Sequence, residues 1–220
     1  MIPLRDVVPS RTTPYITITI IALNALAWLF ELSLPHPVLN EFITLYGVVP
    51  AAFAPATLVT SMFLHGSWSH VLGNMWYLWI FGDNVEDRLG HGRFIVFYLL
   101  CGTVAALGQV AADPSSWLPT IGASGAIAGV MGAYFVLYPR SRVLTLIPLI
   151  IFWDIIELPA ILLLGFWFVM QLFSAGAIAA TANAGRGGVA FAAHVAGFGV
   201  GMLGVFVFRR RRSGGWETGF

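Results

Sequence analysis

Four polar residues within apolar segments carry groups that could hydrolyse an amide bond. Ser124 lies in a segment of small residues, and His194 lies in the last apolar segment of the chain. A serine hydroxyl becomes a nucleophile when a base removes its proton, and a neutral His can do this and then protonate the leaving amine. His70 and Asn74 lie four residues apart and carry N–H donors of the kind that stabilise an oxyanion.

Each of these residues also has an ordinary structural explanation. Small residues such as those at 122–125 are common where membrane helices pack closely, and serine is frequent among them. A single His within a membrane commonly bonds a carbonyl group of a neighbouring helix, and Asn74 could join two helices in the same way. The choice between the two explanations depends on whether the fold brings the residues together.

The composition is that of an integral membrane protein. Of the 220 residues, 58% are hydrophobic and only 10% are charged, which is too little polar surface for a soluble domain of this size. The formal net charge of +1 argues against a nucleic-acid partner. Cys101 is the single cysteine, so an intrachain disulfide and a cysteine-based metal site are both excluded.

Long apolar segments predict an all-α polytopic membrane protein, a bundle of six transmembrane helices. A helix needs about 20 mostly apolar residues to cross a bilayer. The predicted spans are 15–34, 68–82, 94–112, 121–138, 158–180 and 188–208. The proline-interrupted segment 35–67 is expected to form a half-embedded first loop at the membrane interface. Residues 83–93 are expected to form a solvated charged turn, and the short apolar segment 143–153 a loop.

The arginines predict the orientation of these helices, because cytoplasmic loops of membrane proteins are rich in Lys and Arg. Six spans place every arginine except Arg186 on one side, together with both tails, 1–14 and 209–220. A seventh span at 143–153 would export the four-arginine tail, so six is the better count. We therefore expect cytoplasmic tails and a membrane domain over 15–208. Without a transit-type extension, a prokaryotic plasma membrane is the expected location.

The predicted orientation brings the four polar residues to one depth. The second, fourth and sixth spans all begin at the outer face, and the polar residues lie in about the first two turns of each. Agreement in depth across three helices favours a common site over independent helix contacts. We expect no acidic side chain at this depth. The prediction is therefore a Ser–His dyad whose imidazole is held by packing, and no metal.

Three motifs, in order and at compatible separations, resemble those of the rhomboid family of intramembrane serine proteases. They are the segment 65–74 (HGSWSHVLGN), the tetrapeptide 122–125 (GASG) and the segment 193–197 (AHVAG). The resemblance covers nearly the whole chain, roughly residues 15–208, in the minimal six-helix form. The three motifs together are far more specific than GASG alone.

The resemblance implies a role for each reacting group. Ser124 would be the nucleophile, and His194 the general base and acid. His70, Asn74, Gly122 and the backbone N–H of Ser124 would form the oxyanion site. The substrates would be transmembrane proteins cut near the outer membrane face, membrane lipids would surround the helices, and no cofactor would be needed.

A lateral substrate gate is also implied by the resemblance. Trp167 and Phe168 of the fifth span would form it against Trp76 of the second. Aromatic residues at these positions suit lipid-facing or interfacial packing equally well.

Small residues predict how two of the spans pack. Gly125 and Gly129, like Gly197 and Gly201, repeat at four residues and would bring the fourth and sixth spans into contact. Two features depart from the family pattern. The Trp-Arg pair common in the first loop of some members is missing, with Ala56 and Thr57 near the expected place, which leaves open how rigid that loop is. Many rhomboids have an aromatic residue four positions after the serine, where this chain has Ala128. That departure leaves open how the His194 ring is oriented.

Two other classes of function compete with proteolysis. A rhomboid-like protein could bind membrane clients without cutting them. A transporter is less favoured, because the spans lack an evident inverted repeat and membrane-embedded carboxylates. The sequence leaves open the substrate, the cleavage-site preference, the oligomeric state and the role of His65.

Overall fold

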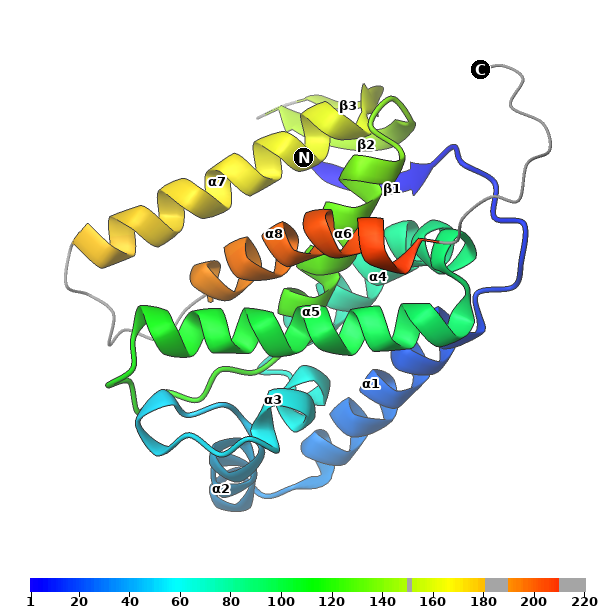
Figure 1. The fold of residues 1–220 in the computed structure, drawn as a ribbon. Coiled ribbons are helices and arrows are strands. Elements are labelled where there is room, and N and C mark those ends of the chain that lie inside the picture. The colour runs from blue at the N-terminus through cyan, green and yellow to red at the C-terminus, as the bar shows by residue number, and fades with distance from the viewer. Residues whose placement is uncertain (150–151, 181–189, 210–220) are drawn as a thin grey trace.

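The chain folds into a helical bundle with one small sheet (Figure 1). The computed structural model describes residues 1–149, 152–180 and 190–209. The helices are α1 (Tyr15–Ser33), α2 (His36–Tyr46), α3 (Thr57–Thr60), α4 (Trp68–Leu89), α5 (His91–Ala112), α6 (Ser124–Leu137), α7 (Ala160–Ala180) and α8 (Phe191–Phe208). The strands are β1 (Ile2–Asp6), β2 (Arg142–Leu149) and β3 (Phe152–Pro159), and 3-10 turns cover Pro50–Ala52 and Ser61–Phe63.

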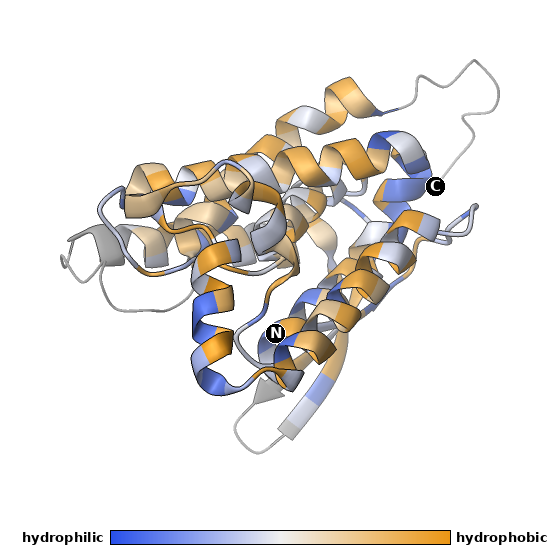
Figure 2. Ribbon diagram, turned by 90° about the horizontal axis from the view of Figure 1, so that it is seen from below, coloured by the Kyte–Doolittle hydropathy of each residue, from blue (hydrophilic) through white to orange (hydrophobic). Residues whose placement is uncertain are grey.

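Several helices have the length and composition of membrane spans. Within the described residues, four qualify: α1, α5, the Ala160–Ala177 part of α7, and α8. Helix α6 is apolar but has only 14 residues, and α4 has 22 residues but carries charges in its last turns. Figure 2 shows hydrophobic residues along most of the length of the helices. The chain is therefore a mostly helical, multi-pass membrane protein, while the count of six spans stays a prediction.

Helix α6 lies inside the bundle and approaches α8 very closely. Residues 125–134 of α6 are all buried. A Cβ added at Gly197 would collide with the backbone oxygen of Gly125, and one at Gly201 with that of Gly129. The predicted contact between these helices through small residues is therefore confirmed.

The predicted charged turn at 83–93 is wrong, because α4 continues as a helix until Gly90, with a φ of 84°, turns the chain into α5. Glu86 is fully buried rather than solvated. Its carboxylate accepts hydrogen bonds from the backbone N–H groups of Ile16 and Thr17, at 2.9 and 2.8 Å. The first N–H groups of a helix have no partner within it and favour a nearby negative charge. Glu86 therefore fastens α4 to the start of α1.

The segment 143–153, predicted to be a loop, lies largely within a β-hairpin, and β1 extends the hairpin to a three-stranded sheet. The strands are antiparallel in the order β1-β2-β3, and Val143 pairs with Asp6 on one side and Leu158 on the other. Many hairpin residues are Ile, Val or aromatic, which suit extended backbone. Strand pairing also satisfies N–H and C=O groups that a loop would leave without partners.

Strand β1 ties this sheet to the helices. The Trp76 Nε1–H of α4 donates to the Pro3 carbonyl oxygen at 2.7 Å. Near the other end of the strand, Asp6 accepts hydrogen bonds from Asn84 Nδ2 at 2.8 Å and from the Tyr134 hydroxyl at 2.7 Å. The sheet lies at the end of the bundle where α6 ends and α7 begins (Figure 1).

The segment between α1 and α4 contacts the stretch of chain that leads into α6. Val48 and Thr120 exchange two backbone hydrogen bonds, at 3.0 and 2.8 Å. The Gly122 N–H donates to the Ser61 carbonyl oxygen at 2.8 Å. These bonds hold the chain just before Ser124. The location of this segment at the membrane interface stays a prediction.

Candidate active site

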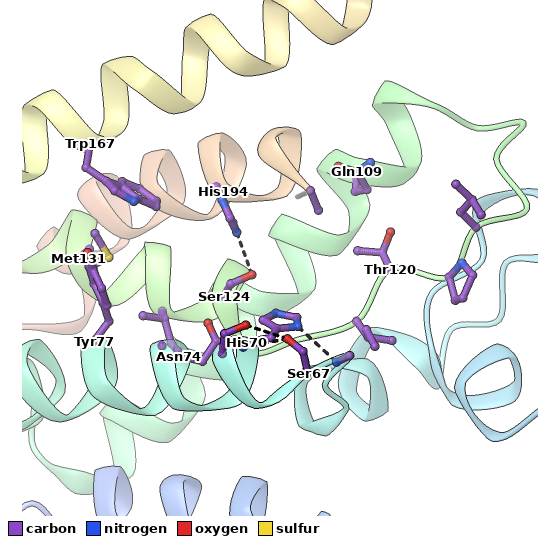
Figure 3. Close-up of a pocket in the computed structure, with 18 of the residues that line it drawn as sticks. Ser67, His70, Asn74, Tyr77, Gln109, Thr120, Ser124, Met131, Trp167 and His194 are labelled. Carbon is purple, nitrogen blue, oxygen red and sulfur yellow. Dashed lines mark hydrogen bonds between the residues drawn. The ribbon is translucent and has the colours of Figure 1, made fainter. Parts of the chain in front are cut away.

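Ser124 and His194 are neighbours at the closely packed starts of two helices. Ser124 is the first residue of α6, and His194 lies in the first turn of α8. Ser124 Oγ and His194 Nε2 are 2.8 Å apart, a hydrogen-bond distance (Figure 3). The backbones of the two helices touch at Gly125 and Gly197, and this close approach brings the Ser124 and His194 side chains within hydrogen-bond distance. The fold thus brings together the serine and the base that the sequence predicts.

A glutamine of α7 holds the His194 ring in one tautomer. His194 Nδ1 lies 2.8 Å from Gln171 Oε1. Because an amide oxygen can only accept, Nδ1 carries the ring proton, and Nε2 is left to accept from the Ser124 hydroxyl. The expectation that packing alone holds the imidazole is therefore wrong. The signal for Gln171 was present in the sequence, as a strongly polar residue inside the predicted span 158–180.

Aromatic side chains pack around the same ring. The ring centroid of Trp167 lies 5.7 Å from that of His194, and that of Phe191 lies 6.5 Å away. Ala128, where the family resemblance leads one to expect an aromatic residue, is buried in α6 and offers only a methyl group. The aromatic contact to the imidazole therefore comes from α7 and α8.

The His70 ring carries its proton on Nε2, so this nitrogen can donate a hydrogen bond within the site. The Gly66 N–H donates to His70 Nδ1 at 3.4 Å, which leaves the ring proton on Nε2. Gly122 lies directly beside Nε2: its φ is +116°, which favours glycine, and a Cβ there would collide with this nitrogen. The His70 Nε2–H is therefore held against the segment that leads into Ser124.

Gly122 has a different role from the predicted one. Its N–H is bonded to the Ser61 carbonyl oxygen, so it is not a donor for an oxyanion. The Ser124 N–H, in the first turn of α6, has no partner within the helix. Gly122 therefore contributes space for His70, and Ser124 is the better candidate for a backbone donor.

His65, to which the sequence assigned no role, contacts Asn74. Asn74 Nδ2 and His65 Nε2 are 2.9 Å apart, and both residues are buried. The His65 N–H in turn lies 3.2 and 3.3 Å from the two carboxylate oxygens of Glu31 in α1. Glu31 is 1% exposed, so the expectation of no acidic side chain near the site is wrong. Of the two N–H bonds of the Asn74 amide, this network uses one and leaves the other for a ligand.

A cavity of about 820 Å³ joins these groups, and Ser124, His194, His70 and Asn74 all line it (Figure 3). Near the starts of α4 and α6 its lining includes Ser67, Ser69 and Thr120, and further along the helices it includes Tyr77, Met131 and Trp167. The cavity therefore has a hydroxyl-rich end and an aromatic and apolar end, with the Ser–His pair between them.

The three residues predicted to form a gate contact different parts of the molecule. Trp167 lies in the cavity wall, and its ring centroid is 6.0 Å from that of Phe198 in α8. Phe168 stacks on the same Phe198 ring at 4.5 Å. Trp76 donates its hydrogen bond to Pro3 in β1. Two of the three thus pack on α8, and the third holds the N-terminal strand.

The side chains around the cavity suit nucleophilic and acid–base chemistry. They include a hydroxyl hydrogen-bonded to a base, an imidazole donor and an amide donor. Over residues 1–149, 152–180 and 190–209, no group of three or more His, Cys, Asp or Glu side chains is placed to hold a metal ion. Fold and site together define a helical membrane protein with a Ser–His pair in an open cavity.

Comparison with known proteins places the chain in a family. The model of the rhomboid domain matches residues 53–211, and the chain belongs to the rhomboid family, as its motifs predict. It is 35% identical over 127 residues to the putative rhomboid protease YdcA of Bacillus subtilis, a match that covers 56% of this chain and 62% of that protein.

Two further relatives show how far the likeness extends. Rhomboid-like protein 11, chloroplastic, of Arabidopsis thaliana is 26% identical over 205 residues, covering 85% of this chain and 66% of that protein. The rhomboid protease GluP of Bacillus subtilis is 38% identical over 76 residues, covering 34% of this chain and 14% of that protein. The chain thus spans less than two thirds of the length of each of these relatives.

Proposed function

We propose that this protein is an intramembrane serine protease that hydrolyses peptide bonds of transmembrane proteins. The observation that carries the proposal is the 2.8 Å hydrogen bond between Ser124 Oγ and His194 Nε2, in a cavity that also holds other donors. Membership of the rhomboid family supports it, as does similarity to two proteins named as rhomboid proteases, one of them putative.

Acylation would begin with the transfer of the Ser124 hydroxyl proton to His194 Nε2 while Oγ attacks the substrate carbonyl carbon. The carbonyl oxygen becomes an oxyanion. It would accept hydrogen bonds from the His70 Nε2–H, the second N–H of the Asn74 amide and the Ser124 N–H. Collapse of the tetrahedral intermediate breaks the C–N bond. The proton on His194 then goes to the leaving amine, and an ester remains on Ser124.

Deacylation would use the same groups with water in place of the amine. His194 Nε2 takes a proton from water as the water oxygen attacks the ester carbonyl. The second tetrahedral intermediate releases a carboxylic acid, and the proton returns from His194 to Ser124 Oγ. Water would reach the site from the hydroxyl-rich end of the cavity, at Ser67 and Ser69.

The membrane setting of the reaction belongs to the same proposal. Residues 15–208 would form the membrane domain of a plasma-membrane protein, with cytoplasmic tails at 1–14 and 209–220 and cleavage near the outer face. A substrate helix would enter between α4 and α7, past Trp76, Trp167 and Phe168. The distribution of arginines and the apolar end of the cavity support this arrangement.

A comparison of wild type with Ser124→Ala and His194→Ala tests the proposed reaction. A labelled single-span substrate is incubated with each protein in liposomes. We expect cleavage by the wild type and a loss of at least about a thousandfold in both variants, because each lacks one of the two groups that move the proton. Circular dichroism checks that the variants remain folded.

The opposite result would identify a different function. If wild type and both variants bind the substrate equally and none cleaves it, the protein is a client-binding rhomboid-like protein. The Ser–His hydrogen bond would then be a contact between helices.

A further inference from the structure

We infer that Gln171 is a positioning residue for His194. Because Gln171 belongs to α7 and His194 to α8, the Ser124–His194 pair is correctly arranged only while α7 packs against α8. The inference rests on the proposed protease function and adds a residue and a conformational requirement to it. Its basis is the 2.8 Å contact between Gln171 Oε1 and His194 Nδ1, beside the 2.8 Å contact between His194 Nε2 and Ser124 Oγ.

The chemical need for such a residue comes from the two tautomers of neutral His. With the proton on Nε2, the ring cannot accept the Ser124 proton; with the proton on Nδ1, it can. The Gln171 oxygen bonds only to the second form, so it selects the tautomer that is able to act as a base. When Nε2 becomes protonated during attack, the Nδ1–H becomes a stronger donor to the same oxygen.

An amide is a suitable acceptor for this position inside a membrane protein. A carboxylate would bond to Nδ1 more strongly, but it would bring a charge into an apolar helix at considerable cost. An uncharged amide oxygen orients the ring without that cost. Trp167, one helical turn before Gln171, lies against the same ring and restricts its rotation.

The position of Gln171 on α7 links the tautomer to the position of that helix. The buried side chains of α7 lie near its start, at Ala160, Leu163 and Leu164, whereas Met170 and Leu172 on either side of Gln171 are exposed. At the level of the site, α7 contacts α8 through the Gln171 hydrogen bond and through rings packed on Phe198. Movement of this part of α7 away from α8 breaks the bond to Nδ1.

The test compares Gln171→Leu and Gln171→Glu with wild type and with the control Leu172→Ala. Leu172 is the next residue of α7 and is exposed, so its change alters the same helix without altering the bond. Four quantities are measured: kcat for a labelled single-span substrate, KM for the same substrate, the rate of Ser124 labelling by a small fluorophosphonate, and the pH profile of kcat.

We expect Gln171→Leu to lower kcat and the labelling rate by about ten- to a hundredfold, with KM within about twofold of wild type. Gln171→Glu restores an acceptor at the same length and recovers most of kcat. It also moves the acid limb of the pH profile to higher pH, because a carboxylate favours the protonated ring. Leu172→Ala behaves as wild type.

Three results would overturn the inference. One is a wild-type kcat and labelling rate in Gln171→Leu. Another is a changed KM with unchanged labelling by the small probe, which would make Gln171 part of the substrate entrance. If Gln171→Leu does not fold, an unshifted pH profile in an active Gln171→Glu overturns it. A wild type that neither cleaves nor labels would instead refute the proposed protease function.

Discussion

The two histidines of the site are both held as neutral rings, but with their protons on opposite nitrogens. The Gly66 N–H donates to His70 Nδ1, so His70 presents an Nε2–H as a donor. The oxygen of Gln171 accepts from His194 Nδ1, so His194 presents a bare Nε2 as a base. The same residue type therefore supplies a hydrogen-bond donor at one position and a base at the other. In each case the tautomer is set by the one atom that bonds to Nδ1.

Gly122 shows how strongly a single residue constrains this arrangement. We expect Gly122→Ala to lower kcat by about a hundredfold, the scale of losing one oxyanion donor. The physical reason is that an added Cβ would lie only 2.5 Å from His70 Nε2, on a residue whose φ of +116° L-residues rarely adopt. Steady-state cleavage of the labelled substrate measures the effect.

The matched control is Gly92→Ala in α5, where an added Cβ meets no atom within 4 Å. This variant should cleave at the wild-type rate. Wild-type activity in Gly122→Ala would show that His70 is not needed where the structure places it.

At the scale of elements, the three-stranded sheet is joined to the helix bundle through a half-buried acid. Asp6 of β1 accepts from Asn84 of α4 and from Tyr134 of α6, so one carboxylate connects three elements. Burial, more than any other cause, raises the pKa of Asp6 to about 6, while the hydrogen bond from Tyr134 acts in the opposite direction.

This raised pKa predicts how stability depends on pH. The folded chain holds the Asp6 proton more tightly than the unfolded chain, in which the carboxyl has its ordinary pKa of 3.8. The resulting stabilisation is fully present below about pH 4 and is lost as pH rises through about 6. Denaturant unfolding in detergent between pH 4 and 8 should show this slope in the wild type and a flatter dependence in Asp6→Asn.

A suitable control is Glu157→Gln on β3. In the wild type, Glu157 forms an ion pair with Arg142 at the surface of the sheet. An exposed pair of this kind contributes little, so the pH slope should remain. Equal slopes in wild type and Asp6→Asn would show that Asp6 ionises freely in the folded protein.

At the scale of the whole molecule, the site exists because α6 and α8 touch backbone to backbone. Gly197→Leu should reduce cleavage by about a hundredfold or more while the protein still inserts and folds. The added side chain meets the Gly125 oxygen and pushes the helices apart, which lengthens the Ser124–His194 distance. A displacement of about 1 Å at a reacting group can cost about a hundredfold in rate.

Gly199→Leu is the matched control, because a Cβ at Gly199, two residues along the same helix, meets nothing within 4 Å. It should retain wild-type cleavage and labelling. If Gly197→Leu retained them as well, the close approach of α6 and α8 would not be what holds the pair in place.

Much of this protein could be predicted from local sequence alone. Apolar segments long enough to cross a bilayer are expected to form helices, because every backbone N–H and C=O needs a partner there. A polar side chain in such a helix must face the protein interior or water, so the placement of Ser124, His194, His70 and Asn74 near helix starts already predicted one common site. The glycine pairs of α6 and α8 predicted the contact that joins two of these helices.

The remaining features depend on contacts between segments far apart in the chain. Charged residues are typical of a solvated turn, and only the neighbouring start of α1 turns Glu86 into a buried helix cap. The segment 143–153 lies largely within strands because β2 pairs with both β1 and β3. A short apolar segment does not by itself specify these partners. Likewise, Gln171 and His194 lie 23 residues apart on different helices, and a tautomer is set by whichever atom the fold places beside the ring. The sequence by itself therefore determined that the four polar residues of the predicted site face one common cavity, because the bilayer acts on each residue separately. Tertiary structure alone decided which atom each of those groups bonds.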